Sequence, residues 1–174
     1  MPCSTPDSPL PQACVADFTD ASLIVPELRE RDMAGVIKEL AQQLHMRGWV
    51  QDILPFYNAA LIREYLSSTA TGSGLAFPHA RIQSLDHLRF ALGRSTEPFG
   101  WGTPRRTLVQ FVFVIAAPLR DSASYLHLLS GLAILGRTEL LLAELKQAQT
   151  PQRILEILKK LPLRTAEVSQ LAAC

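Results

Sequence analysis

The segment REYLSSTATGSGLAFPHAR, residues 63–81, gathers the side chains of this chain that are best suited to chemistry on an anion. It begins at Arg63, continues through small residues and ends just beyond Pro78 and His79. The pKa of an imidazole lies near neutrality, so a histidine is a nucleophile at the pH of a cell. Pro78 fixes one backbone angle beside His79, which limits how far the histidine can move.

The small residues between Arg63 and His79 are typical of a phosphate-binding loop. Gly72, Ser73 and Gly74 can turn backbone N–H groups toward an anion. The guanidinium of Arg63 offers a fixed fork of donors to phosphate oxygens. The same residues also fit a plain turn, a charge at a helix C-terminus and a solvated or buried histidine. Composition and spacing therefore indicate a candidate anion site around His79 and no particular reaction.

Two helices are expected before this segment, and the second of them positions Arg63. Asp32 can cap the first helix, whose apolar residues recur at helical spacing until Gly48. The second helix spans about residues 53–67, with Asp52 as its cap. Arg63 then lies near the C-terminal end of that helix.

The residues after the loop alternate between strands and helices, which is typical of the α/β class. Residues 111–116 are apolar on both faces, as in a strand in the middle of a sheet that helices cover on each side. His79 follows a short strand, and the carboxyl ends of strands are where α/β sheets bind ligands. Strands are expected at residues 75–78, 89–95 and 111–116, and further helices from Ser122 or Ser124 and from Thr150.

The chain has the size and composition of a single domain. Its 174 residues, 48% of them apolar, can form one core and are too few for two. Residues 1–20, rich in Pro, Ser and Thr, are expected to be a flexible tail, and residues 163–174 a second tail. The domain then spans residues 21–162.

The overall charge and the hydrophobic pattern exclude several classes of protein. Lys and Arg number 17 and Asp and Glu 16, so a formal charge of +1 does not draw the chain to nucleic acid or to an anionic membrane. The longest apolar run, residues 111–119, is about half of a membrane span. The N-terminus does not have the pattern of a secretory signal. We expect a cytoplasmic protein without membrane insertion.

Cysteine and histidine usage predicts no metal site. The three cysteines lie at positions 3, 14 and 174 without a CxxC pair, and His79 and His87 have no third ligand clustered with them. His45 and His87 are expected at the surface. A local excess of arginine between residues 81 and 137 fits either a solvated face or a docking surface for an acidic partner.

The segment resembles the phosphorylation-site motif of the fructose/mannitol-type enzyme IIA domains of the bacterial phosphotransferase system. In that family an Arg-Glu pair, a Thr, a Gly-rich loop and a terminal Ala-x-Pro-His recur at these spacings. The likeness extends from the helix at VPELRERDMAGVIKELAQQL to the helix at TPQRILEILKK, so it covers most of the chain and leaves the tails outside. The residues that match the motif are Arg63, Glu64, Thr69, Gly72, Gly74, Ala76, Pro78 and His79.

The resemblance implies a phosphohistidine relay. In the family a carrier protein, HPr or its nitrogen-branch relative, hands a phosphoryl group to a histidine of the IIA domain, and His79 matches that acceptor. The transfer is an in-line displacement, for which Arg63, Thr69 and the loop amides are candidates to stabilise charge on the oxygens. No cofactor or metal is implied. The implied fold is a single domain with a mixed sheet of about five strands and helices on both faces.

One position departs from the family pattern. The family carries a second active-site histidine at the start of the third helix, and Tyr125 stands at the aligned position. His127 lies two residues on, about 200° around a helix, and would take that place only if the alignment shifted. Tyr125 can donate a hydrogen bond to a phosphate oxygen but cannot share a proton as an imidazole does near pH 7.

The leading hypothesis is a phosphocarrier of the IIA class, which relays a group rather than turning over as a stand-alone enzyme. A nitrogen-regulatory type, with an HPr-like donor and a regulatory target protein as partners, is favoured. A IIA subunit of a fructose/mannitol-type transporter, which passes the group to a IIB-like domain, stays open. The alternative from another class is a non-catalytic protein-binding module on the same fold, which Tyr125 favours. The pattern predicts no particular oligomeric state.

Overall fold

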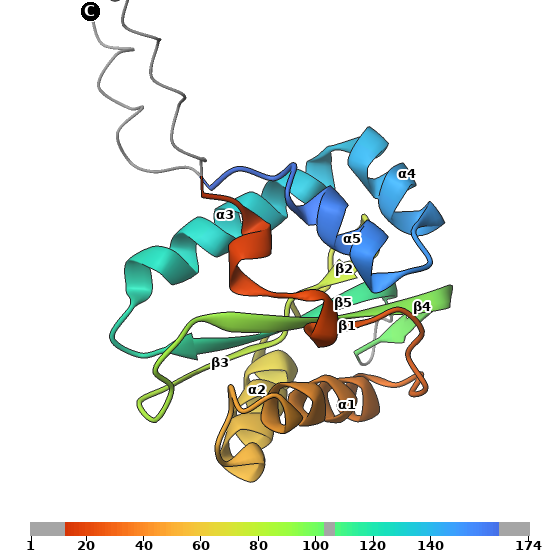
Figure 1. Cartoon of the computed structure of the whole chain (residues 1–174). Coiled ribbons are helices and arrows are strands. Elements are labelled where there is room, and N and C mark those ends of the chain that lie inside the picture. Colours follow the sequence, from red (N-terminus) through yellow and green to blue (C-terminus); the bar gives the residue numbers. More distant parts are fainter. Residues whose placement is uncertain (1–12, 103–106, 164–174) are drawn as a thin grey trace, which may run out of the picture.

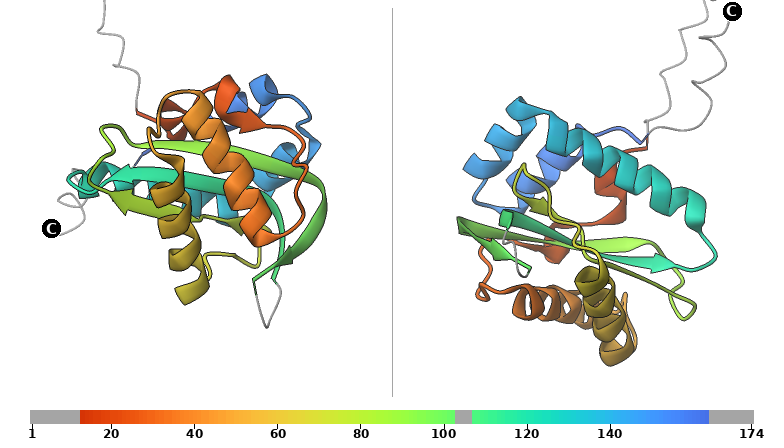
Figure 2. Two further views of the ribbon diagram at one scale, coloured as in Figure 1. Left: turned by 90° about the horizontal axis from the view of Figure 1, so that it is seen from below. Right: turned by 180° about the vertical axis from the view of Figure 1, so that it is seen from behind.

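A computed structural model describes residues 13–102 and 107–163, which form one sheet between two layers of helices (Figure 1). Helices α1 and α2 cover one face of the sheet, and α3, α4 and α5 cover the other, as the further views in Figure 2 also show. The predicted α/β class with helices on both faces is therefore confirmed. In chain order the elements are η1 (Val15–Phe18), η2 (Ala21–Leu23), β1 (Ile24–Val25), α1 (Met33–Met46), α2 (Ile53–Leu66), β2 (Leu75–Ala76), β3 (His79–Ile82), β4 (Arg89–Trp101), β5 (Thr107–Pro118), α3 (Ser122–Arg137), α4 (Glu139–Gln147) and α5 (Pro151–Leu158).

The sheet is mixed, and β5 lies in its middle. The strand order is β1-β4-β5-β2, and β3 also pairs with β5; β4 and β5 are antiparallel, and the other pairs are parallel. Leu75 of β2 pairs with Phe111, and His79 of β3 pairs with Ile115. Because the two pairs have the same offset, β2 and β3 are two parts of one edge strand. The interruption includes Pro78, which has no N–H to donate.

Side chains of β5 alternate between two cores, one under each helix layer. Phe111, Phe113 and Ile115 contribute to the core beneath α3 and α5, whereas Val112 and Val114 contribute to the core beneath α1 and α2. All five side chains are fully buried. A strand that is apolar on both faces therefore lies in the middle of the sheet, as the sequence predicts.

Both helices expected before the candidate site form, but the predicted cap of the second is wrong, since the Asp52 side chain accepts no capping hydrogen bond. Asp32 caps α1 by accepting a hydrogen bond from the N–H of Gly35 at 2.9 Å. Gly48 follows the end of α1 with a φ of 79°, a left-handed conformation that glycine adopts readily. α2 begins directly after Asp52, and Arg63 lies in its last turn.

The strand expected at residues 89–95 is longer than predicted. β4 continues to Trp101 because a register shift between Arg94 and Phe99 lets the ladder with β5 resume beyond the polar residues of its middle. This extension carries Trp101 to a buried position behind the loop that precedes β2. The sequence pattern missed it because Pro98 and its polar neighbours are typical of a turn.

Helix α4, like the short elements η1, η2 and β1, was not indicated by the sequence pattern. It begins one residue after α3 ends, and the chain bends by 87° between the two helices. Within the described residues no single helix is long and apolar enough to cross a membrane; only α3 and α4 taken together, across this bend, reach that length and composition.

Part of each expected tail belongs to the folded domain. Val15 is fully buried, its N–H donates to the carbonyl of Leu161 at 2.9 Å, and the N–H of Leu163 donates to the carbonyl of Ala13 at 2.9 Å. The prediction is therefore wrong for residues 13–20 and for Leu163. Val15 packs against α3 at Gly131, where a Cβ atom would lie 2.6 Å from Val15 Cγ2. The remaining parts of the expected tails lie outside the described residues.

Candidate functional site

His79 opens β3, within the edge strand of the sheet. It pairs with Ile115 in the interior of β5, so the expected position at the carboxyl edge of the sheet is wrong. Alternate residues of a strand face the same side. His79 and Arg81 face α3, where both contact Tyr125, whereas Ala80 packs in the core beneath α1 and α2. The histidine is therefore half-buried under α3 rather than free at a sheet end.

The ring of His79 is held in one tautomer. Its Nδ1 lies 2.9 Å from the carbonyl oxygen of Phe77. A carbonyl oxygen only accepts hydrogen bonds, so Nδ1 carries the hydrogen and Nε2 keeps its lone pair. The ring nitrogen that is free to act as a nucleophile is therefore Nε2.

The surroundings of His79 favour the neutral imidazole. Burial is the main cause that lowers the pKa of His79 below the ordinary value of 6.5, and the charges of Arg63 and Arg81 act in the same direction. The hydrogen bond to Phe77 and the carboxylate of Glu64 oppose this shift. The lone pair on Nε2 is consequently available at pH 7.

An NMR titration of the His79 ring should give a midpoint below 6.5. The ability to attack an electrophile should be lost only as the pH falls through that lowered pKa, because protonation removes the lone pair. The unfolded chain takes up this proton at a higher pH than the folded chain, so the free energy of unfolding should also decrease as the pH falls below 6.5. The resonance that disappears in His79→Gln identifies the ring, and a midpoint at or above 6.5 would refute the burial argument.

A buried carboxylate organises the loop behind His79. Glu64 is 2% exposed and accepts hydrogen bonds from the N–H of Thr69 at 2.7 Å, from the Thr69 hydroxyl at 2.8 Å and from Nε1 of Trp101 at 2.8 Å. The Thr69 hydroxyl in turn accepts from the N–H of Phe77 at 2.9 Å. The carbonyl of Phe77 holds the ring of His79. Thr69, which was expected among the groups that stabilise the oxygens, is instead hydrogen-bonded to Glu64 and Phe77, and its connection to His79 runs through Phe77.

Helix α3 brings Tyr125, and not His127, against His79. The ring centroids of Tyr125 and His79 lie 5.6 Å apart, with their planes at 48°. Burial raises the pKa of Tyr125 above its ordinary value of 10.0, so the hydroxyl stays protonated at pH 7. His127 is partly exposed on another side of the helix, as two residues of helical advance require.

Arg63, in the last turn of α2, acts on the same site through its charge. Its Nη1 donates to the carbonyl of Ser67 at 2.9 Å, which holds the guanidinium at the end of the helix. Alongside burial, which dominates both shifts, the charge of Arg63 lowers the pKa of His79 and of Tyr125. The guanidinium therefore acts on both rings and favours an anion between them.

The loop of Gly72, Ser73 and Gly74 does not come together with His79. A Cβ atom at Gly136 would lie 3.2 Å from Ser73 Oγ, so the loop packs near the C-terminal end of α3. His79 contacts Tyr125 near the other end of that helix, a rise of about 16 Å away. The extended edge strand between loop and histidine keeps them apart, and the expected phosphate cradle is not assembled around His79.

Arg81 is the site residue that sequence reasoning did not single out. Its guanidinium carbon lies 5.2 Å from the centroid of the Tyr125 ring, and its charge lowers the pKa of His79 after the larger effect of burial. The pattern His79-Ala80-Arg81 could have identified it. If these residues form a strand, positions two apart share a face.

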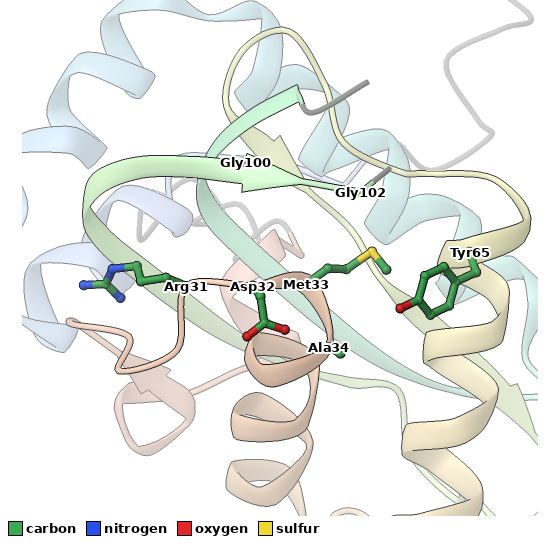
Figure 3. Close-up of a pocket in the computed structure, with 7 residues that line it drawn as sticks. All are labelled: Arg31, Asp32, Met33, Ala34, Tyr65, Gly100 and Gly102. Atoms are coloured by element: carbon green, nitrogen blue, oxygen red, sulfur yellow. The ribbon is translucent and has the colours of Figure 1, made fainter. Parts of the chain in front are cut away.

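Two hollows lie near the site without containing His79. A groove of about 320 Å³ lies between the small-residue loop, Phe77 and the C-terminal half of α3. A second hollow of about 170 Å³ lies between the start of α1, Tyr65 of α2 and the end of β4 (Figure 3). Met33 and Tyr65 point toward each other there, and Arg31 points away. Arg31 pairs with Glu27 and Asp32 caps α1, so the two charged side chains of this hollow are already engaged.

Comparison with known proteins places this arrangement in a family. The sequence profile of the family described as "Phosphoenolpyruvate-dependent sugar phosphotransferase system, EIIA 2" matches residues 17–161. The chain belongs to this family. The enzyme IIA resemblance that the motif predicts is thus confirmed. The match begins at residue 17, within the residues that were expected to be a tail.

Two relatives show the range of proteins that carry an enzyme IIA domain of this kind. The chain is 28% identical over 153 residues to the nitrogen regulatory protein of Bradyrhizobium diazoefficiens, covering 87% of this chain and 98% of the relative. It is 29% identical over 133 residues to the fructose-specific EIIABC component of Bacillus subtilis, covering 76% of this chain and 21% of the relative. The chain therefore matches about a fifth of the EIIABC component and nearly all of the nitrogen regulatory protein.

A solved structure confirms the enzyme IIA fold. The chain superposes on a chain of the complex of enzyme IIAMTL and phosphorylated enzyme IIBMTL from Escherichia coli with a TM-score of 0.69. The two are 20% identical, and the match covers 80% of this chain and 96% of that chain. At this identity the likeness establishes the fold alone.

Proposed function

We propose that the chain is a phosphocarrier that accepts a phosphoryl group on Nε2 of His79 from a phosphohistidine of an HPr-type carrier protein. The state of the His79 ring is the observation that carries this proposal. The ring is neutral at pH 7 and half-buried, and Phe77 holds its Nδ1–H so that the free lone pair is on Nε2. An imidazole in this state attacks phosphorus without a general base.

The transfer exchanges one phosphorus–nitrogen bond for another. The lone pair of His79 Nε2 forms a bond to phosphorus while the bond to the carrier imidazole breaks, and the electron pair of that bond stays on the carrier nitrogen. Positive charge develops on the His79 ring, and the carbonyl of Phe77 stabilises it by accepting from Nδ1–H at 2.9 Å. No proton has to leave for the transfer to occur.

Arg63 and Tyr125 supply electrostatic stabilisation in this proposal. The guanidinium of Arg63 is held by the carbonyl of Ser67 at 2.9 Å and keeps other donors for phosphoryl oxygens. The Tyr125 hydroxyl stays protonated and makes no hydrogen bond to any other described residue. It can therefore donate to a phosphoryl oxygen on His79, although it cannot share a proton as a second histidine does.

The nitrogen-regulatory type is the assignment we favour for the relay. It is supported by the similarity to a nitrogen regulatory protein over 98% of that protein's length. A carrier of this type passes its signal to a regulatory target protein. The similarity to the fructose-specific EIIABC component supports the other assignment, in which a IIB-like domain receives the group. Transfer from the phosphorylated chain to an isolated IIB-like domain would distinguish the two.

A non-catalytic binding module on the same fold is the second candidate. Tyr125 favours it, because a tyrosine at this contact removes the proton-sharing ability of an imidazole. The contacts that hold His79 in one tautomer oppose it, since a module that only binds does not require a free Nε2. The two candidates differ in whether His79 becomes phosphorylated.

Incubation with phosphoenolpyruvate, enzyme I and an HPr-type carrier tests the proposal. We expect the intact mass to rise by one phosphoryl group, the label to be lost in acid as for a phosphoramidate, and the labelled peptide to contain His79. A reaction without the carrier serves as the control. No label with several carriers in a folded sample, or label on another residue, would reject the phosphocarrier and support the binding module.

A further inference from the structure

We propose that Arg81 binds the phosphoryl group on His79, as a second guanidinium opposite Arg63. This inference rests on the proposed function. The first argument for it is strand alternation: Arg81 follows His79 by two residues in β3, and both side chains face α3. A strand rises about 3.3 Å per residue, so the two side chains start about 7 Å apart, within reach of a shared tetrahedral anion.

The guanidinium of Arg81 is anchored on one side and free on the other. Its Nη2 donates to the carbonyl of Leu119 at 3.0 Å and to the hydroxyl of Ser122 at 2.6 Å. Its Nε is buried and has no acceptor among the described residues, and its Nη1 has no partner there either. The unpaired Nη1 is therefore the donor that an acceptor arriving from outside can use.

Within the part of the chain that the structure describes, no carboxylate pairs with Arg81. Among the ion pairs between described residues, none includes Arg81 or Arg63. Asp121, which precedes α3, accepts from the N–H of Ser124 instead. Glu64 is occupied by the donors of the loop behind His79. Two guanidinium groups outside any ion pair, against the single buried carboxylate of Glu64, leave a net positive charge beside a neutral imidazole, which suits a doubly charged phosphoryl group.

Tyr125 holds Arg81 and His79 in a fixed relation. The guanidinium carbon of Arg81 lies 5.2 Å from the centroid of the Tyr125 ring, and the His79 ring lies 5.6 Å from the same centroid. Contact with the same aromatic ring restricts both side chains and lowers the entropy that Arg81 loses when it binds an anion. The Gly72–Gly74 loop lies too far away to serve, so Arg81 takes the role that sequence reasoning assigned to the loop amides.

The substitution Arg81→Gln tests the proposal in the full chain. At equilibrium with a phosphorylated HPr-type carrier, the ratio of phosphorylated to free His79 should fall by about 10- to 100-fold, as expected for the loss of a charge-assisted pair of hydrogen bonds. Arg81→Lys keeps the positive charge but loses the paired donors of the guanidinium, so its ratio of phosphorylated to free His79 should lie between those of Arg81→Gln and the wild type. Arg120→Gln is the matched control, because Arg120 pairs with Asp86 at 2.9 Å and its side chain is 69% exposed.

The outcomes separate this inference from the proposed function. If the wild type is labelled and Arg81→Gln reaches the same phosphorylated fraction, the role of Arg81 is overturned and the phosphocarrier proposal stands. The same holds if Arg81→Gln and Arg120→Gln lower that fraction equally. If the wild type takes no label, titration with inorganic phosphate followed by NMR decides the matter. Phosphate that binds about 10-fold more weakly to Arg81→Gln supports the anion site, and equal binding overturns it. Circular dichroism and the unfolding midpoint of each variant establish that it is folded.

Discussion

Replacing His79 by glutamine is expected to abolish phosphoryl acceptance, with a loss in rate of at least ~10³-fold. The amide of glutamine has no free nitrogen lone pair to attack phosphorus, yet its side chain can still donate to the carbonyl of Phe77. Because His79 is only half-buried, the free energy of unfolding should change by about 1 kcal/mol or less. The time course of intact mass during incubation with a phosphorylated carrier measures the acceptance rate.

His127→Gln is the matched control for this substitution. His127 is partly exposed on another side of α3, and the contact with His79 is made by Tyr125 instead. We therefore expect His127→Gln to accept the phosphoryl group at the rate of the wild type. Acceptance that survives in His79→Gln would remove His79 from the reaction, and acceptance that disappears in His127→Gln would restore the alternative alignment of the helix.

Truncating Glu64 to alanine is expected to lower the free energy of unfolding by about 3–5 kcal/mol. Glu64 is 2% exposed, and its removal leaves the N–H and hydroxyl of Thr69 and the Nε1 of Trp101 without their acceptor in a buried place. Urea denaturation followed by tryptophan fluorescence measures this loss. The Thr69 hydroxyl would also lose its position against the N–H of Phe77, so the acceptance rate of His79 should fall as well.

Glu144→Ala provides the comparison for Glu64→Ala. Glu144 pairs with Lys160 at 2.7 Å and Arg153 at 3.5 Å on the surface, where solvent screens the charges. This substitution should change the unfolding midpoint much less than Glu64→Ala and leave acceptance unchanged. Equal effects of the two variants would mean that the buried contacts of Glu64 contribute no more than an exposed ion pair.

Much of the fold is predictable because local patterns agree with tertiary packing. The cap at Asp32, the left-handed position at Gly48 and the start of the last helix at Thr150 are properties of short stretches, and each forms as expected. The two-sided apolar pattern of β5 identifies a central strand because both neighbouring layers require apolar contacts. The extension of β4 and the helix α4 escaped prediction because a register shift and a sharp bend depend on the elements around them.

The site likewise has features that the local sequence indicates and features that depend on pairing with distant strands. The candidate residues, with His79 as the proposed nucleophile and Arg63 as the proposed cation, come from the segment 63–81, and the resemblance to enzyme IIA domains rests on the same segment. The position of His79 inside an edge strand was not readable, because it depends on pairing with a distant strand. The same pairing separates the glycine loop from His79 and turns Arg81 toward it.

The sequence by itself indicated the family through the resemblance of its motif, the candidate acceptor His79, and the α/β class with helices on both faces, because these depend on residue identity and local pattern. Only the tertiary structure decided which groups surround the nucleophile. Contacts such as those of Tyr125 with His79 and Arg81 join α3 to β3 across some forty residues of chain, and packing of the helix on the sheet sets them. The free lone pair on Nε2 is likewise a product of burial and of the carbonyl of Phe77, which act only once the chain is folded.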